Sequence, residues 1–149
     1  MAKTTIDSRG AVTGPGAGLN VKGPATFRAG MKEAVVAKTA AATLTAGGVY
    51  TISSSAALTI TLPDPADVPG APFTFRCASV HAHQITSPQV TADTETIHCT
   101  AGITHVGSTD GARLALENVV GSSVRMVSDG AKYLITAASG TLTIATPSS

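Results

Sequence analysis

Short segments in which apolar and polar residues alternate constrain this chain more than any other feature of its sequence. In "LTITL", Leu58, Ile60 and Leu62 alternate with threonines, and "PFTFRC" alternates two phenylalanines and a cysteine with polar residues. Successive side chains of a strand point to opposite faces of a sheet, so this pattern predicts strands with one buried face.

The same alternation recurs in "ARLALEN", "SVRMVSDGAKYLIT" and "TLTIAT", and Gly, Pro, Ser or Asp residues separate the segments. The residues predicted to face inward are Leu114, Leu116, Val124, Met126, Tyr133, Ile135, Leu142 and Ile144. The Asp129-Gly130 dipeptide predicts a two-residue hairpin turn, and no long helix is expected after Tyr50. Short strands separated by turns predict an all-β fold, an antiparallel sandwich or barrel.

The first part of the chain lacks this alternation. "MAKTTIDSRGAVTGPGAGLNVKGPATF" contains five glycines and two prolines without a stable hydrophobic period, which predicts an extended arm. The following "AGMKEAVVAKTAAATLTAGGVYTI" tolerates a helix, but Val35, Val36 and the threonines favour strands. We expect an extended N-terminal arm over residues 1–38 and a compact β domain over residues 39–149.

Charge is distributed unevenly between these two parts. The net charge is +1, but residues 1–38 hold six basic and two acidic residues, whereas residues 39–149 hold four basic and seven acidic ones. The basic arm could dock onto an acidic protein surface or remain a solvated tail. Nucleic acid is not an expected partner, because the charges are spaced and no aromatic residue precedes Phe27. The residues expected to make the arm's contacts are Lys3, Arg9, Lys22, Arg28 and Lys32.

Composition disfavours several other classes of protein. No apolar run approaches the ~20 residues of a membrane span, and the N-terminal residues lack the apolar centre of a secretory signal, so we expect synthesis in the cytoplasm and no membrane contact. Aromatic residues make up 3% of the chain and tryptophan is absent, which disfavours a carbohydrate-binding face. Tyr50 and Tyr133 lie within strand patterns and are expected to be core rings with the hydroxyl at an edge.

Two cysteines, Cys77 and Cys99, are too few for a disulfide framework. A reducing compartment favours buried packing residues with free thiols, and a bridge between the two is the alternative.

The only cluster that resembles a metal site is "VHAHQ" with the later "TIHCT". His81 and His83 share a face if their segment is a strand, but His98 and Cys99 then point to opposite faces and do not converge on one ion. Surface or inter-subunit histidines are the favoured interpretation, and no metal is expected.

Catalytic patterns are also missing from the sequence. No serine lies in a G-x-S-x-G elbow, and no cysteine has a recognisable activating context. Asp93 and Glu95 are too few for a calcium loop, and the glycines do not form a phosphate loop. We therefore expect a protein that is not an enzyme and has no cofactor.

The stretch "LTITLPDPADVPG" predicts a strand that ends at a rigid corner. Pro63 removes a backbone donor from the ladder, and Asp64 and Asp67 are turn-forming residues before they are candidate catalysts. The corner presents the same surface in every copy, so it could also touch a neighbouring subunit. Its candidate interface residues are Pro63, Asp64, Pro65 and Pro69.

"TLTAGGVYTISSSAALTITLPDPADVPGAPFTFRCAS" resembles a module of virion proteins from tailed bacteriophages. The shared features are a Thr-rich entry, a Tyr-x-Ile strand, a strand ending in Leu-Pro, a Pro/Gly turn and a Phe-x-Phe strand. "GSSVRMVSDGAKYLITAASGTLT" is similar to the usual end of that module, with Tyr133 where many relatives have tryptophan. The resemblance covers about residues 42–142.

Such modules occur in trimeric head decoration proteins and in tail fibres or spikes. A fibre usually needs a long shaft, whereas this chain offers an arm and one β body, which favours decoration. The resemblance thus implies a structural virion protein on the capsid surface, a homotrimer that binds the major capsid protein at capsomer junctions and stabilises the shell. The alternative is a tail fibre or spike component that recognises a host receptor or joins a tail partner.

Overall fold

The computed structural model describes residues 5–6, 12–13, 35–88 and 96–146. The chain divides into two units, Met1–Lys32 and Glu33–Ser149. In the first unit, β1 (Thr5–Ile6) pairs antiparallel with β2 (Val12–Thr13). The remaining strands belong to the larger unit.

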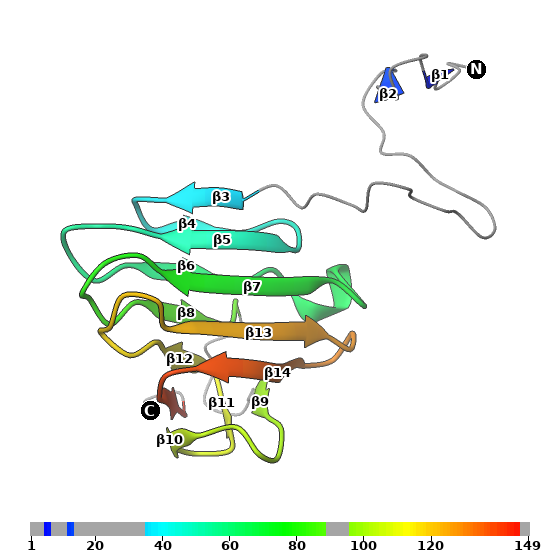
Figure 1. The fold of residues 1–149 in the computed structure, drawn as a ribbon. Coiled ribbons are helices and arrows are strands. Elements are labelled where there is room, and N and C mark those ends of the chain that lie inside the picture. Colours follow the sequence, from blue (N-terminus) through cyan, green and yellow to red (C-terminus); the bar gives the residue numbers. More distant parts are fainter. Residues whose placement is uncertain (1–4, 7–11, 14–34, 89–95, 147–149) are drawn as a thin grey trace. The chain divides into compact units, whose positions relative to one another are not determined.

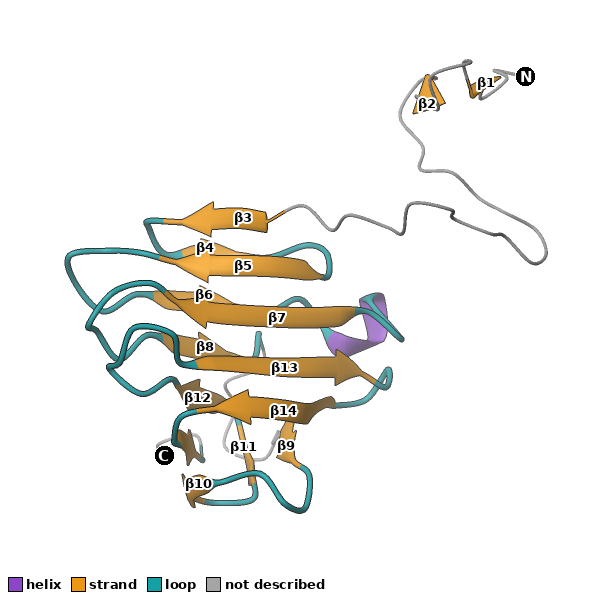
Figure 2. Ribbon diagram, in the orientation of Figure 1, coloured by secondary structure: helices purple, strands orange, loops and turns teal. Residues whose placement is uncertain are grey.

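The larger unit consists of two sheets that form two layers (Figures 1 and 2). The seven-stranded sheet contains, in spatial order, β11 (Asp110–Gly111), β9 (Ile97–Cys99), β14 (Tyr133–Ser139), β13 (Ser123–Ser128), β7 (Pro72–Cys77), β5 (Gly48–Ile52) and β3 (Val35–Lys38). The six-stranded sheet contains β10 (His105–Gly107), β15 (Leu142–Ala145), β12 (Arg113–Ala115), β8 (Gln84–Thr86), β6 (Thr59–Thr61) and β4 (Ala42–Thr43). A single 3-10 turn, η1 (Pro65–Asp67), is the only helical element among the described residues. The predicted all-β class is confirmed.

Strand pairing is mixed, whereas the sequence pattern suggested an antiparallel arrangement. From β3 to β8 the chain crosses to the other sheet after every strand, so β3, β5 and β7 pair in parallel, as do β4, β6 and β8. A strand that returns to its sheet after a crossover runs parallel to its predecessor, unlike the two arms of a hairpin. Antiparallel pairing joins β13 to both β7 and β14, and β12 to both β8 and β15.

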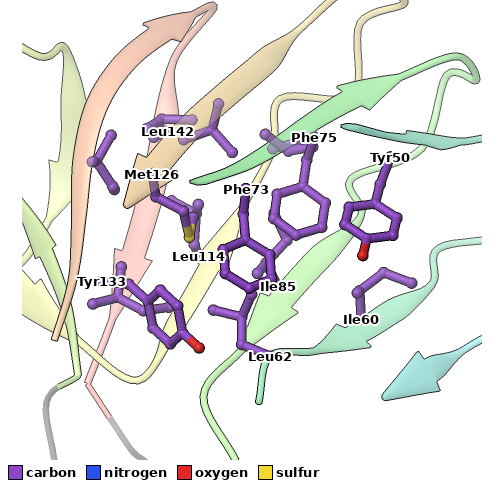
Figure 3. Packing of buried hydrophobic residues seen from close by; sticks show 14 of the residues in the cluster. Tyr50, Ile60, Leu62, Phe73, Phe75, Ile85, Leu114, Met126, Tyr133 and Leu142 are labelled. Atoms are coloured by element: carbon purple, nitrogen blue, oxygen red, sulfur yellow. The ribbon is translucent and has the colours of Figure 1, made fainter. Parts of the chain in front are cut away.

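The core lies between the layers and contains the alternating residues that the sequence predicted to face inward. Four aromatic rings run through it: Tyr50 stacks on Phe75 and Phe73 meets Tyr133 edge to face, each at 5.5 Å between centroids (Figure 3). The predicted inward residues that are at most 2% exposed are Ile60, Leu62, Phe73, Phe75, Cys77, Leu114, Leu116, Val124, Met126, Tyr133, Ile135, Leu142 and Ile144.

The hairpin between β13 and β14 has a longer loop than the Asp129-Gly130 dipeptide predicted. Ser128 pairs with Tyr133, which leaves four residues, 129–132, in the loop. The Asp129 side chain stabilises this loop, because its Oδ1 accepts from the backbone N–H of Ala131 at 2.8 Å and of Lys132 at 2.6 Å. A short polar side chain that bonds to following backbone groups favours such a turn.

Each end of the sandwich has two edge strands, but the chain connects them differently: β10 and β11 lie at one end, and β3 and β4 at the other. At one end the chain passes directly from β11 in one sheet to β12 in the other, and the backbone N–H of Ala112 donates to the carbonyl of Ala145 at 3.1 Å. At the other end β3 and β4 are the edge strands of their sheets, and each has one neighbouring strand. Val35–Lys38, which the sequence analysis assigned to the arm, thus forms an edge strand of the larger unit.

Candidate functional site

The sequence proposed two sets of interface residues, on the arm and at the corner after β6. The arm residues lie outside the described residues, and so do Asp93 and Glu95. These arm residues are Lys3, Arg9, Lys22, Arg28 and Lys32.

The corner residues lie together between β6 and β7, where the chain forms η1. Asp64 precedes the turn, and its Oδ1 accepts from the N–H of Ala66 at 3.0 Å, which satisfies a backbone donor at the start of the turn. Pro65 is buried, Pro63 and Asp64 are half-buried, and Pro69 is exposed. The prediction that Asp64 forms the turn is confirmed.

The β13–β14 hairpin fixes this corner. The Tyr133 hydroxyl donates to the carbonyl of Pro63 at 2.7 Å, and the Ser128 hydroxyl donates to the carbonyl of Pro65 at 2.8 Å. The backbone N–H of Gly70 donates to the carbonyl of Ser128 at 2.8 Å. Burial raises the pKa of Tyr133 far above its ordinary value, and the nearby Asp64 and Asp67 add to the effect, so this hydroxyl keeps its proton. Ser128 was missed by sequence reasoning, although it begins the "SDG" turn signal.

His83 is a structural histidine. It lies in the loop before β8 and is fully buried, which corrects the expectation of a surface or inter-subunit position for this residue. Its Nδ1 accepts from the backbone N–H of Leu58 at 3.1 Å, so the neutral ring carries its proton on Nε2, which lies 2.7 Å from the Ser79 hydroxyl. Burial lowers the pKa of His83, and the neighbouring His81 lowers it further.

This tautomer decides what the Ser79–His83 pair can do. A general base must present a lone pair to the serine hydroxyl, but the Nε2 of His83 presents a proton. Both ring nitrogens already have protein partners, which leaves no free lone pair for a metal ion. The pair therefore holds the β7–β8 loop to the start of β6.

Both cysteines are buried and free, so the bridged alternative is wrong for this structure. The Cys77 thiol donates to the carbonyl of Ser79 at 2.8 Å. The sulfur of Cys99 lies 3.4 Å from Nδ1 of His105, but burial raises the pKa of the Cys99 thiol, which disfavours the reactive thiolate. As predicted, Cys99 is buried while the neighbouring His98 is partly exposed.

A surface ion cluster joins β9, β11 and the hairpin loop. Oδ1 of Asp110 lies 2.8 Å from Nδ1 of His98 and 3.1 Å from Nζ of Lys132. The hydrogen bond from His98 lowers the pKa of Asp110, and Lys132 contributes to the same shift. The side chains are 29–43% exposed, so the cluster is a modest surface stabiliser. No group of three potential metal ligands occurs in the described part of the chain.

An apolar ridge lies in the loop between β12 and β13. Val119 and Val120 are 51% and 59% exposed. A hollow of about 370 Å³ beside Val120 is lined by Thr51, Arg76, Cys77, Ala78 and Gly121, and a second hollow of about 290 Å³ borders both valines. We call Val119 and Val120 the valine ridge. Sequence reasoning did not select it, although two adjacent valines cannot both face the core of an alternating strand.

No protein-family model matches the chain, and no curated protein matches it. Within the described residues, no helix is long and apolar enough to cross a membrane.

Proposed function

We propose that the protein is a structural virion protein that decorates a bacteriophage capsid and stabilises it. It binds as a trimer at capsomer junctions, and its N-terminal arm contacts the major capsid protein. The resemblance of residues 42–142 to modules of tailed-phage virion proteins supports this proposal.

The observation that carries the proposal is the valine ridge with its two adjacent hollows. Exposed apolar surface next to a recess is typical of a protein–protein interface. A ridge on one copy can fit a hollow on the next, and such a head-to-tail contact closes into a ring when the rotation between copies is suitable. Small lining residues such as Ala78 and Gly121 leave room for a valine side chain.

The polar groups of the larger unit support a role in assembly rather than in catalysis. His83 and Ser79 hold a loop, the two cysteines are buried, and Asp110 bonds to His98 and Lys132. Each of these groups is used to hold the fold together. The proposed action is therefore mechanical: the molecule bridges capsomers and buries surface at their junctions.

The proposed role of the arm follows from its charge. Residues 1–32 hold five basic residues and one acidic residue, a net charge of +4, and three arms on one trimer raise avidity for acidic patches without improving any single contact.

Co-sedimentation with expanded heads tests the proposal. Deletion of residues 2–28 is expected to abolish most of the binding, while light scattering gives a trimer for both proteins. A matched control replaces Arg125, an exposed basic residue of the β domain that lines neither hollow, with serine, and this variant is expected to bind normally. A truncated protein that still saturates heads with unchanged affinity would contradict the role of the arm, and a monomer that ignores heads would contradict the whole proposal.

A second candidate function is a tail fibre or spike component. From β3 to β8 the chain winds between the two sheets, and we call this segment the coil. The coil favours this candidate, because the stacked turns of solenoid proteins form extended binding surfaces. Glycan binding by the purified protein, together with no binding to heads, would support this candidate over decoration.

A further inference from the structure

The end of the sandwich formed by β3 and β4 has two edge strands on one turn of the coil. β3 ends the seven-stranded sheet, β4 ends the six-stranded sheet, and only three residues, 39–41, separate them. In Figure 1 both strands lie at the same end of the two layers. An edge strand presents backbone N–H and C=O groups that can pair with another chain.

β3 lacks the features that usually protect an edge. Val35 and Val36 are 63% and 42% exposed, and no proline, bulge or charge occurs from Val35 to Ala37. Lys38 is the one charged residue of the strand, and its Nζ lies over the ring of Tyr50, 5.6 Å from the centroid. The lysine is thus directed at its own molecule rather than placed to repel an approaching strand.

The opposite end of the sandwich also has two edge strands, β10 and β11, but its chain connection differs. There the chain crosses directly between the sheets from β11 to β12, and the backbone N–H of Ala112, between these two strands, donates to the carbonyl of Ala145 in β15.

We propose that the β3–β4 end binds a second copy of this chain across a two-fold axis. One axis perpendicular to both layers pairs β3 with β3 and β4 with β4 at the same time, because the second copy offers the same two edges at the same separation. A single extended peptide covers only one of the two edges. The two-edge geometry therefore favours a second copy over a peptide.

Two-fold symmetry also restricts the register of the pair. In an antiparallel pair of identical strands related by a two-fold axis, the axis passes between one residue and the same residue of the second copy. Side chains directly opposite each other in the pair then point to the same face of the sheet. Centring the pair on Val36 sets Val35 opposite Ala37 of the second copy. The two copies of Lys38 then lie at opposite ends of the pair, and like charges do not meet.

This register continues the core from one copy to the next. Val36 is aligned with Tyr50 in the parallel ladder and therefore lies on the inward face of its sheet. Tyr50 is 7% exposed, so the two Val36 side chains would meet beside an existing apolar wall. The paired strands are short, so the contact is small and depends on protein concentration.

The two-fold contact does not rest on the proposed function. It uses β3 and β4, whereas the proposed trimer contact uses the valine ridge. Molecules that use both contacts form hexamers if the two-fold axes cross the threefold axis at right angles, and molecules that use the two-fold contact alone form dimers.

Light scattering of the full chain over a wide concentration range tests the contact. The mass is expected to double with concentration, from monomer to dimer or from trimer to hexamer. Val36→Lys and, independently, Val35→Lys should remove the doubling, so that the mass at high concentration falls twofold. Val106→Lys changes a similarly exposed valine of β10, and the mass of this control variant should double with concentration as that of the original protein does. Val119→Lys should affect the trimer without removing the doubling.

Hydrogen exchange on the same samples identifies the strand involved. The amides of β3 should become protected as the mass doubles. A mass that does not double, or a doubling that persists in both β3 variants, would overturn the inference. Protection of β3 in the species that has not doubled would also overturn it, because the chain's own residues would then cover the edge. Circular dichroism of the lysine variants shows whether they retain the fold.

Discussion

The Tyr133 hydroxyl donates a hydrogen bond to the carbonyl oxygen of Pro63, 70 positions away, over 2.7 Å. This bond joins the start of β14 to the corner after β6. Tyr133 occupies the position at which many phage virion modules similar to this chain have tryptophan. Its hydroxyl therefore holds the corner after β6, which belongs to the stretch on which that resemblance depends. The ring is fully buried, and the hydroxyl reaches the edge of the core, as predicted for both tyrosines.

Replacement of Tyr133 by phenylalanine should loosen the corner. The change removes one hydrogen bond and leaves the carbonyl of Pro63 without this donor, which should lower the free energy of unfolding by about 1–2 kcal/mol in urea denaturation. Exchange of the Gly70 amide, which donates to Ser128, should also accelerate. Tyr50→Phe is the matched control, because its hydroxyl donates to Ala46 and lies outside the corner. Equal exchange of Gly70 in both variants would show that Tyr133 does not fix the corner.

His83 should make stability depend on pH in mildly acidic solution. Its pKa in the folded state is lower than the ordinary value of 6.5, so the unfolded chain binds the proton more readily than the folded chain. The stability that the neutral ring provides is fully present above about pH 6.5, the ordinary pKa, and is lost as the pH falls below it towards the lowered pKa of the folded state. Asp110 has a lowered pKa and an ordinary value of 3.8, so its contribution is lost only in more acidic solution.

Urea denaturation at several pH values measures this dependence. His83→Gln can keep an acceptor for Leu58 and a donor for Ser79 without titrating in this range, so its slope between about pH 7 and about pH 5 should be flatter. His81→Gln should retain most of the original slope, since the neighbouring His81 is the smaller cause of the shift. An unchanged slope in His83→Gln would assign the pH dependence to other groups.

The two thiols should be hidden in the folded protein. Cys77 and Cys99 are each 2% exposed, and burial raises the pKa of Cys99. A disulfide reagent that releases a coloured product when it reacts with a thiol measures this accessibility. It should label both thiols rapidly in denaturant and both much more slowly in the native state. Cys99→Ser identifies which thiol accounts for any native reaction. Rapid native labelling of Cys99 would mean that its contact with His105 activates it.

Gly107 should tolerate no side chain. Its φ is +95°, and a Cβ atom there would overlap the carbonyl oxygen of Ile144 in the neighbouring strand. Gly107→Ala should lower the free energy of unfolding by about 3 kcal/mol or more, the combined cost of backbone strain and overpacking. Gly102→Ala is a matched control with φ of +89° and open space around the Cβ, so it should show about 1–2 kcal/mol of strain alone. If both variants lose the same free energy of unfolding, the overlap with Ile144 does not contribute.

Period-two alternation was enough to predict β6, β7, β12, β13, β14 and β15 and their buried faces. Phe73, Phe75 and Cys77 face the core as expected, because the side chains of a strand alternate regardless of its partner. The partner itself was not predictable from this pattern. β5 pairs with β7 across a crossover, and alternation looks the same in parallel and antiparallel strands.

The candidate site was predicted less completely. Proline and aspartate specify a turn locally, so the corner at residues 63–70 was recognisable. His83 was assigned to the wrong environment, because its burial depends on Leu58 and Ser79, which only the fold brings to its two nitrogens. The valine ridge carried a signal in the adjacent pair Val119-Val120, but its neighbouring hollows come from residues of three other segments.

The mixed pairing also sets an order of folding. In the coil, each strand meets a partner that follows after one crossover, so β3 to β8 can assemble in sequence as the chain emerges from the ribosome. β13 pairs with β7 across some fifty residues, Val124 with Phe75 for example, and must wait until most of the chain has been synthesised. Until then the edge of β7 is open. The late strands therefore cover this edge last, and we expect a chain that stalls before β13 to expose a hydrophobic strand to neighbouring molecules.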